Sequence, residues 1–244
     1  MSDKNVFYMI DGDIDGSSSF LVNLVKSQDG AFSKPSLLCT LFDKVPKDKV
    51  ISIVMNTKGG ALCHLDKIMR KLKSHTAGYI VYVKNDCYSA GALLCLGAKE
   101  IVMNQDSCIG KIDPQEVGNG RTVIIYKNIS KEHIDSRTIY YHKNALYLCN
   151  YTEKLLSLTG LDEKQLESVK ENLLYSEFPH ETLFDYEECK KMGLPVRKPR
   201  KDEETFFKNT KTNDYKAVEE TKSNWSLWVV VVITIGLSYW FLRR

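Results

Sequence analysis

Two stretches, Asn56-Thr-Lys-Gly-Gly60 and Asn85-Asp-Cys-Tyr-Ser-Ala-Gly-Ala92, decide the fold of this chain. Each follows a β-branched run, at 50–55 and at 79–83, and each leads into a sequence with helical periodicity. Two strand-to-helix turns of this kind predict an α/β fold with parallel strands. Because the carboxyl ends of parallel strands meet at one edge of a sheet, we expect both turns at the same edge.

The residues in these turns suit acyl transfer. Ser89 is expected at a helix N-terminus, where the helix dipole and free amide groups favour developing negative charge. Gly59 and Gly60 allow backbone N–H groups to come close enough to complete an oxyanion hole. The alternative interpretation is that Ser89 only caps its helix and the glycines only turn the chain.

Three motifs follow one another in order: Ser89-Ala-Gly91, the run at 94–104, and Ile109-Gly-Lys-Ile-Asp-Pro-Gln115. Together with a closing segment at 187–196, they resemble the serine dehydrogenase proteinase family. That family is a branch of the Clp-protease/crotonase superfamily and is related to signal peptide peptidase A. The resemblance implies a Clp/crotonase-like α/β fold with a parallel β core.

The same resemblance assigns the nucleophile and the oxyanion donors. It implies that Ser89 is the nucleophile of a serine peptidase and that the amides of Gly59 and Ala90 bind the oxyanion. Relatives usually carry a proline before the paired glycines, where this chain has Lys58. The difference alters the rigidity of the turn but leaves both Gly59 and Gly60 in place.

The sequence offers several candidates for the general base. Clp proteases carry a histidine in the third motif, and the nearest match here is Asp113, which suits orientation of a base better than proton abstraction. His180 falls where the family has a histidine, and imidazole titrates in the useful range. Lys143 resembles, by a loose alignment, the lysine of the Ser–Lys dyad of signal peptide peptidase A. His142 and Lys111 are further candidates, and an ordinary surface side chain is the alternative for each of them.

Two functions from different classes remain open. The first is a membrane-anchored serine endopeptidase that hydrolyses peptide or protein substrates and needs no cofactor. The second is a catalytically inactive, membrane-tethered scaffold of the same fold. Crotonase-type acyl-CoA chemistry is a third, weaker alternative, because the Ser-Ala-Gly turn and the Ile-Asp-Pro-Gln loop resemble the peptidase branch. Superfamily members assemble through this fold, so the resemblance also implies a homo-oligomer.

Composition and charge argue against several other classes of function. A chain of 244 residues with 43% hydrophobic residues is long enough for one sizeable core. A net charge of +3 without a basic stripe argues against nucleic-acid binding. The seven cysteines form no Cys-x-x-Cys pair, which indicates reduced thiols, with Cys87 as an alternative nucleophile or, more simply, a structural thiol. The five histidines lack metal-ligand spacing, so we expect no metal.

Residues 225–242 predict a transmembrane tail anchor. They carry no charge over 18 positions, which is about 27 Å as a helix and close to a hydrocarbon core of roughly 30 Å. Aromatic residues lie near both ends, and two arginines close the chain; a buried core helix is the alternative. Eight Lys or Arg residues lie between 197 and 222 and two follow the span, so the domain is expected on the cytosolic side.

The chain therefore divides into a catalytic domain at 1–196, a flexible charged linker at 197–224 and the anchor at 225–242. A tether of about 26 residues reaches on the order of 25–30 Å, so soluble or juxtamembrane peptides are the expected substrates. In this topology the sequons at Asn128, Asn150 and Asn224 carry no glycan.

Overall fold

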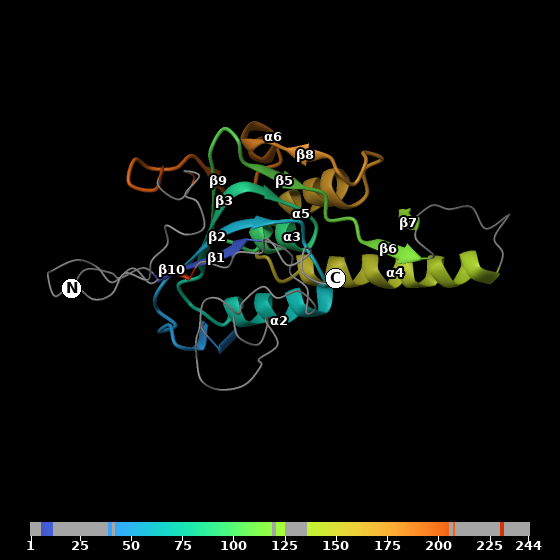
Figure 1. The fold of residues 1–244 in the computed structure, drawn as a ribbon, viewed down its shortest axis with the longest axis horizontal. Coiled ribbons are helices and arrows are strands. Elements are labelled where there is room, and N and C mark those ends of the chain that lie inside the picture. Colours follow the sequence, from blue (N-terminus) through green and yellow to red (C-terminus); the bar gives the residue numbers. More distant parts are fainter. Residues whose placement is uncertain are drawn as a thin grey trace, which may run out of the picture.

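The computed structural model describes residues 6–11, 39–40, 42–118, 121–124, 136–204, 207 and 230–231 (Figure 1). A mainly parallel sheet forms its centre, with the strand order β10-β1-β2-β3-β4-β9. These strands are β1 (Val6–Asp11), β2 (Ile51–Thr57), β3 (Tyr79–Cys87), β4 (Glu100–Met103), β9 (Val196–Arg197) and β10 (Val230–Val231). Every pairing along this path is parallel, which confirms the predicted α/β class and parallel core.

The β-branched runs explain why the central strands lie where they do. In β2, Ile51, Ile53 and Met55 point to one face and are fully buried, and the register places Ile53 beside Val81 of β3. Val54 on the opposite face is also buried. Burial on both faces is typical of parallel strands and accounts for their nearly continuous hydrophobic sequence.

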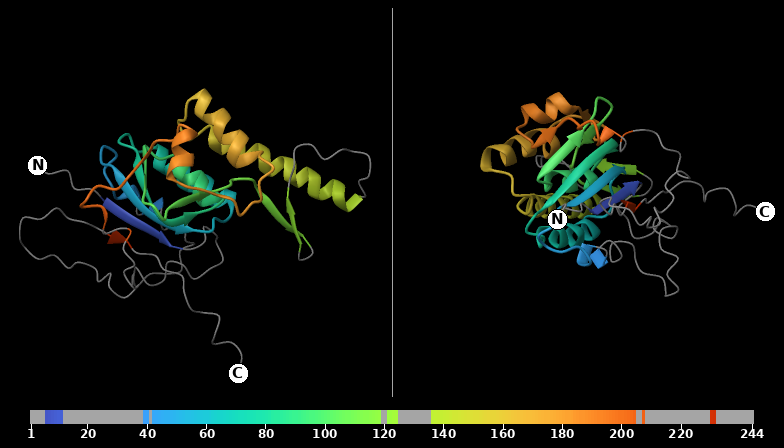
Figure 2. Two further views of the ribbon diagram at one scale, coloured as in Figure 1. Left: turned by 90° about the horizontal axis from the view of Figure 1, so that it is seen from above. Right: turned by 90° about the vertical axis from the view of Figure 1, so that its left-hand side faces the viewer.

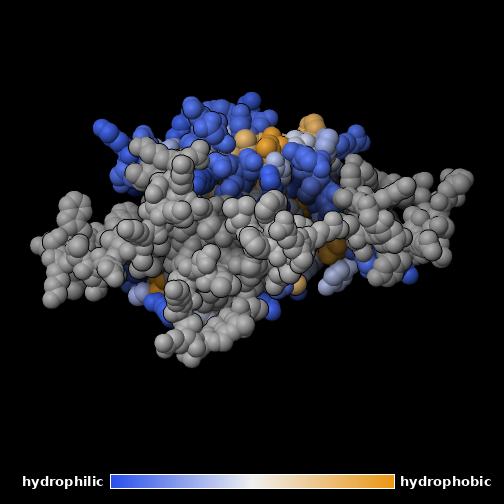
Figure 3. Space-filling view, viewed as in Figure 1, coloured by the Kyte–Doolittle hydropathy of each residue, from blue (hydrophilic) through white to orange (hydrophobic). Residues whose placement is uncertain are grey.

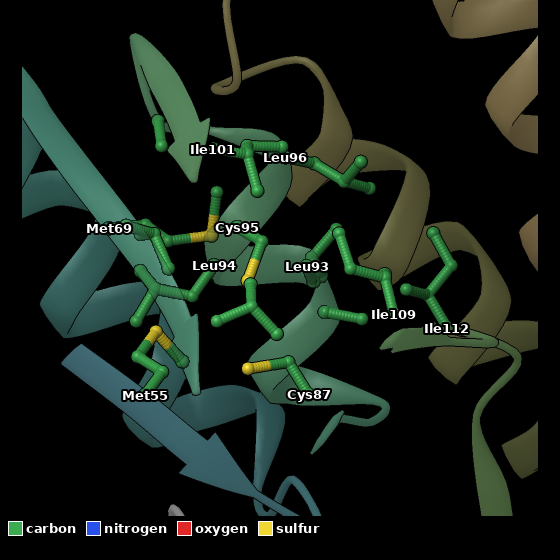
Figure 4. Close-up of a cluster of buried hydrophobic side chains, with 14 of the residues drawn as sticks. Met55, Met69, Cys87, Leu93, Leu94, Cys95, Leu96, Ile101, Ile109 and Ile112 are labelled. Atoms are coloured by element: carbon green, nitrogen blue, oxygen red, sulfur yellow. The ribbon is translucent and has the colours of Figure 1, made fainter. Parts of the chain in front are cut away.

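Helices α2 (Leu62–Lys73), α3 (Ala90–Leu96) and α4 (Ser136–Leu156) contact one another beside the sheet (Figures 1 and 2). In α2 the buried residues recur at helical spacing, as predicted: they are Leu65, Ile68, Met69 and Leu72. All seven residues of α3 are buried. Figure 4 shows its Leu93, Leu94, Cys95 and Leu96 among side chains from the strands and the neighbouring helices. The helix that begins at the Ser89 turn is therefore fixed on all sides by the core.

The second half of the domain adds shorter elements. They are β5 (Cys108–Gly110), β6 (Gln115–Gly118), β7 (Arg121–Ile124), α5 (Glu163–Val169), the π-helix η2 (Lys170–Leu174), β8 (Leu183–Phe184) and α6 (Tyr186–Lys191). Strand β5 pairs in parallel with the end of β3 and antiparallel with β8. The β6–β7 hairpin contacts α4, and the hairpin and the amino-terminal part of α4 project from the body of the domain (Figures 1 and 2).

The start of the predicted linker is bound to the sheet. Arg197 ends β9, and its guanidinium donates two hydrogen bonds to the Glu203 carboxylate, at 2.7 and 2.8 Å, and one to Glu100 at 2.5 Å. The hydroxyl of Tyr82 donates to Glu203 at 3.0 Å, and the amide of Arg200 donates to it at 2.8 Å. We call this group of five residues the Arg197 clasp. The division between domain and linker at residue 196 stays a prediction.

Most of the predicted anchor at 225–242 lies outside the described residues. The exception in the anchor is Val230–Val231, which forms β10 and pairs in parallel with β1. None of the helices in the described part of the chain combines the length and hydropathy needed to cross a membrane. The anchor therefore also stays a prediction.

The described surface in the view of Figure 3 is mainly hydrophilic. A small hydrophobic area interrupts it near α6 and β8. Among the described large hydrophobic residues, Tyr147 and Phe178 are the exposed ones, at 66% and 53%. Phe178 lies in the segment between η2 and β8, and its ring contacts that of Phe184.

Candidate active site

Ser89 occupies the turn between β3 and α3, at the N-cap of the helix. Its backbone has φ +49° and ψ −119°, and among the described residues it is the only non-glycine residue with a positive φ. A serine held in this unfavourable conformation between a strand and a helix has the geometry of a nucleophile elbow. The side chain is half-buried, and within the described structure its hydroxyl has no hydrogen-bond partner. Ser89 is thus oriented by its backbone and left available for another molecule.

The Gly59 turn lies directly against Ser89, as the two strand ends predicted. A Cβ atom at Gly59 would lie 2.8 Å from the Ser89 Cβ and 3.1 Å from the Ala90 amide nitrogen. Gly59 has φ +108°, a conformation that other residues rarely adopt, so both its backbone and its surroundings require glycine. Gly60 is exposed, with φ +147°.

The two predicted oxyanion donors differ in their present partners. The amide of Gly59 donates to the Thr57 hydroxyl at 3.1 Å, in a buried position. The amide of Ala90 has no acceptor among the described residues. One donor at the start of α3 is therefore open, and the other is occupied by a neutral hydroxyl group.

The side chain of Lys58 connects the two turns. Its ammonium lies 4.2 Å from the centroid of the Tyr88 ring and 3.7 Å from Asp86 Oδ2. The Lys58 side chain is 70% exposed, and exposed contacts of this kind contribute at most about 1 kcal/mol. The shape of the Gly59 turn thus depends mainly on buried contacts.

Asp113 and His180 lie 67 positions apart in the sequence and form a hydrogen bond of 2.8 Å between Oδ1 and Nδ1. The Asp113 side chain is only 4% exposed, and that of His180 is 19% exposed. Gln115 donates a second hydrogen bond to the other carboxylate oxygen, at 3.3 Å. An imidazole that donates from Nδ1 to a carboxylate leaves its Nε2 free to accept a proton. The structure therefore pairs the two residues that the sequence suggested as orienting group and base.

One loop, residues 111–113, connects this pair to Ser89. The amide of Ser89 donates to the Lys111 carbonyl oxygen at 2.9 Å, and the amide of Ile112 donates to the Leu173 carbonyl oxygen at 2.9 Å. The loop is thus held between the nucleophile on one side and the end of η2 on the other. No direct hydrogen bond joins the Ser89 hydroxyl to the imidazole of His180 in the described structure.

The remaining candidates are not joined to this site. The side chain of Lys143 is exposed on α4 and forms no hydrogen bond or ion pair with another described residue. The side chain of His142 lies outside the described part of the chain. Cys87 is fully buried beneath α3, so its thiol is not accessible to a substrate and its role is in the core. The described residues contain no group of three or more His, Cys, Asp or Glu side chains that suits a metal ion.

Sequence reasoning missed what Lys111 does. It considered this residue as a base, but the structure buries the side chain to 2% exposure and directs its ammonium to two main-chain carbonyl groups. The local signal was a charged residue inside the apolar run Ile-Gly-Lys-Ile, where a lysine needs a buried partner. The role of Gln115 beside Asp113 carried no separate signal.

Comparison with solved structures supports the fold. Two structures of the 1510-N membrane-bound stomatin-specific protease are similar to this chain. One is a serine-to-alanine variant, with a TM-score of 0.52 and 17% identity, covering 84% of each chain. The other is a lysine-to-alanine variant in complex with a substrate peptide, with a TM-score of 0.50 and 18% identity, covering 82% of this chain and 78% of the other. At these identities the likeness concerns the fold alone.

Two proteins of Methanocaldococcus jannaschii are related in sequence. The uncharacterized protein MJ0137 is 29% identical over 157 residues, which is 62% of this chain and 54% of the relative. The uncharacterized protein MJ1495 is 34% identical over 70 residues, which is 29% of this chain and 24% of the relative. The chain thus spans about half the length of the first of these relatives and a quarter of the second.

A family model assigns the chain directly. The model of the ClpP-like SDH-type serine proteinases matches residues 37–206. The matched region contains both turns, the 111–113 loop and the segment with His180, so it includes every part of the candidate site. This agrees with the resemblance found in the sequence motifs. The chain belongs to the family of ClpP-like SDH-type serine proteinases.

Proposed function

We propose that this protein is a serine peptidase with a Ser89–His180–Asp113 triad. The observation that carries the proposal is the 2.8 Å hydrogen bond between His180 and the buried Asp113. Asp113 belongs to the loop whose Lys111 carbonyl oxygen accepts the Ser89 amide. The order of the residues in the chain is Ser, Asp, His, which is the order in α/β-hydrolases.

The roles follow from the chemistry of each group. Asp113 accepts the Nδ1 proton of His180 and so fixes the tautomer in which Nε2 is the base. Nε2 takes the hydroxyl proton of Ser89 as the oxygen attacks the peptide carbonyl, and then gives that proton to the leaving amine. Water, activated by the same imidazole, hydrolyses the acyl-enzyme and restores Ser89. The Ser89–His180 contact that this requires forms on substrate binding, since such hydrogen bonds are often long without substrate.

The oxyanion hole is proposed from the Ala90 and Gly59 amides. Ala90 has an open N–H at the start of α3, where the helix dipole favours negative charge. The Gly59 N–H is held by the Thr57 hydroxyl, and an oxyanion is a stronger acceptor than a neutral hydroxyl. We propose that the tetrahedral intermediate takes the place of Thr57 as the acceptor of this N–H, so that both donors bind the oxyanion.

The proposed substrate is a peptide or protein, and the proposed setting is a membrane surface. A peptide substrate is supported by family membership and by the peptide bound to the similar stomatin-specific protease. The anchor at 225–242 and the cytosolic orientation rest on the sequence, and helical insertion requires β10 to leave β1. Alkaline carbonate extraction and protease protection test this part; release into the soluble fraction contradicts it. The homo-oligomer is tested by light scattering of purified protein.

Labelling with a fluorophosphonate probe tests the triad. Wild type should be labelled, Ser89→Ala should not, and Ser157→Ala, a serine at the end of α4, should be labelled like wild type. A folded wild type that reacts with neither the probe nor a peptide library contradicts the peptidase and favours the inactive scaffold. Labelling that persists in Ser89→Ala identifies a different nucleophile.

A further inference from the structure

We propose that Lys111 is a positioning residue for the general base, and this inference rests on the proposed peptidase function. Its ammonium group holds the main chain just before His180, while its own carbonyl oxygen holds Ser89. One residue therefore sets the position of the base relative to the nucleophile. Nothing in the triad chemistry itself requires a lysine at this place.

The ammonium group of Lys111 has three polar neighbours. Its Nζ donates to the carbonyl oxygens of Ser176 at 2.8 Å and Phe178 at 2.7 Å, and lies 3.8 Å from Asp113 Oδ2. Two acceptors thus lie within hydrogen-bond distance of the ammonium group, and the carboxylate lies at ion-pair distance. Ser176 and Phe178 come shortly before His180, in the segment that joins η2 to β8.

Because the Lys111 ammonium group is buried, its removal would affect the groups around it. The Lys111 and Asp113 side chains are 2% and 4% exposed, so neither charge is screened by water. A buried charge is tolerated only when it is paired and hydrogen-bonded. Without the ammonium, two carbonyl groups lose their donor and Asp113 loses its nearest cation, so the His180 segment would move away from the Ser89 turn.

The same contacts argue against Lys111 as the base. The Lys111 Nζ is directed toward the carbonyl oxygens of Ser176 and Phe178, and within the described residues no hydrogen bond joins it to the Ser89 hydroxyl. The backbone contact with Ser89 is made by the carbonyl oxygen of Lys111, on the other side of the residue. Lys111 therefore acts through His180 and not on the substrate.

Peptide hydrolysis by Lys111→Met and by Arg197→Met provides the first test. Each variant removes one cation from a network of hydrogen bonds, but only the first lies beside the site. Lys111→Met should lower kcat about 10²-fold with KM changed less than about threefold, because a shift of about 1 Å in a catalytic group costs this much. Arg197→Met should keep the wild-type kcat. In an Asp113→Asn background, Lys111→Met should add less than about threefold, because both changes act through His180.

Proton NMR of the histidine ring provides a readout that does not need activity. A hydrogen-bonded Nδ1–H of His180 should give a downfield resonance in wild type that is absent from His180→Gln. It should be lost in Lys111→Met and retained in Arg197→Met. If Lys111→Met does not fold, Lys111→Gln, which keeps an N–H donor but no charge, is measured in the same way.

The results of these experiments distinguish the positioning role of Lys111 from the proposed peptidase function. An active Lys111→Met with kcat within twofold of wild type and an unchanged His180 resonance overturns the positioning role. Equal losses of kcat in Lys111→Met and Arg197→Met also overturn it, since they indicate a general effect of stability. If wild type hydrolyses nothing, the peptidase proposal fails, and the resonance alone still decides whether Lys111 positions His180.

Discussion

Two networks of charged residues stand at opposite ends of the sheet, the Arg197 clasp and the Lys111–Asp113–His180 group. The clasp joins the amino-terminal part of β3 and β4 to the segment after β9. The Lys111 group lies beyond the carboxyl ends of β2 and β3, next to Ser89. Each places a cation beside a largely buried carboxylate.

The networks differ in what they leave unpaired. In the clasp, both oxygens of Glu203 accept hydrogen bonds from Arg197, and Tyr82 and the Arg200 amide add one more each. At the other end, the Ser89 hydroxyl and the Ala90 amide have no partner within the described structure. A complete network can only stabilise the fold, whereas open donors and acceptors beside a charged pair are what a substrate needs. This contrast separates the site from the clasp more clearly than charge or burial does.

The largest expected effect concerns the Lys111–Asp113–His180 group. Asp113→Asn should keep the fold but lower kcat about 10⁴-fold, because the amide no longer fixes the imidazole tautomer. Steady-state peptide hydrolysis and circular dichroism measure the two quantities. A loss smaller than about tenfold would show that Asp113 does not orient the base.

Gly59→Ala should lower kcat about 10²–10³-fold, because the new methyl group meets Ser89 and displaces one oxyanion donor. Gly160→Ala is the matched control. Gly160 also has a positive φ, +83°, but a Cβ there meets no atom within 4 Å. The control should lose about 1 kcal/mol of stability and no activity. Similar kcat values in Gly59→Ala and Gly160→Ala would show that the Gly59 turn is not part of the site.

At the clasp, Arg197→Met should lower the free energy of unfolding by about 2–3 kcal/mol, since it leaves the Glu203 carboxylate without its main partner. Urea denaturation measures this change. The kcat of the folded variant should equal that of wild type. A loss of activity without a loss of stability would mean that the two ends of the sheet are coupled.

The clasp should also respond to acid. Burial raises the pKa of Glu203, but its hydrogen bonds to Arg197, the Arg200 amide and Tyr82 outweigh this and lower the pKa to about 2, from an ordinary value of 4.5. Its contribution is therefore complete above about pH 4.5 and is lost as the pH falls toward 2. Between pH 5 and pH 3, wild type should lose about 2 kcal/mol more stability than Glu203→Gln. If the free energies of unfolding of wild type and Glu203→Gln change equally between pH 5 and pH 3, this pH dependence does not come from Glu203.

The smallest expected effect concerns Lys143. Lys143→Ala should change kcat by less than about twofold, because the side chain is exposed and joined to none of the triad residues. Peptide hydrolysis under the conditions used for Asp113→Asn provides the comparison. A loss comparable to that of Ser89→Ala would replace the triad with a Ser–Lys dyad.

The sequence was most informative where local patterns determine the structure. The β-branched runs predicted β2 and β3, and the two strand ends predicted that Gly59 would meet Ser89. The contact between Asp113 and His180 has no local signal, since 67 positions separate them and the resemblance alone suggested both residues. Their meeting depends on the position of the segment after η2, which Lys111 holds through main-chain carbonyl groups that are present in every sequence.

The clasp was missed for a different physical reason. Residues 197–204 are polar and Lys/Glu-rich, a composition that predicts a flexible linker. A single arginine in bidentate contact with a glutamate, with Tyr82 beneath them, binds this segment to the sheet without large aliphatic residues. Composition averages over a segment, and so it does not detect one pair with good geometry.

The clasp also determines where a mechanical load on the tail would be borne. Once β10 has left β1, as insertion of the anchor requires, a pull on the chain beyond Phe207 would otherwise pass along the backbone through β9, α6 and β8 to the segment that carries His180. Because Glu203 is bonded to Arg197 and Tyr82, the tension would reach β3 and β4 first, through side chains at the end of the sheet remote from Ser89. The base and the nucleophile would then keep their separation while the protein is held under tension by its carboxyl-terminal tail.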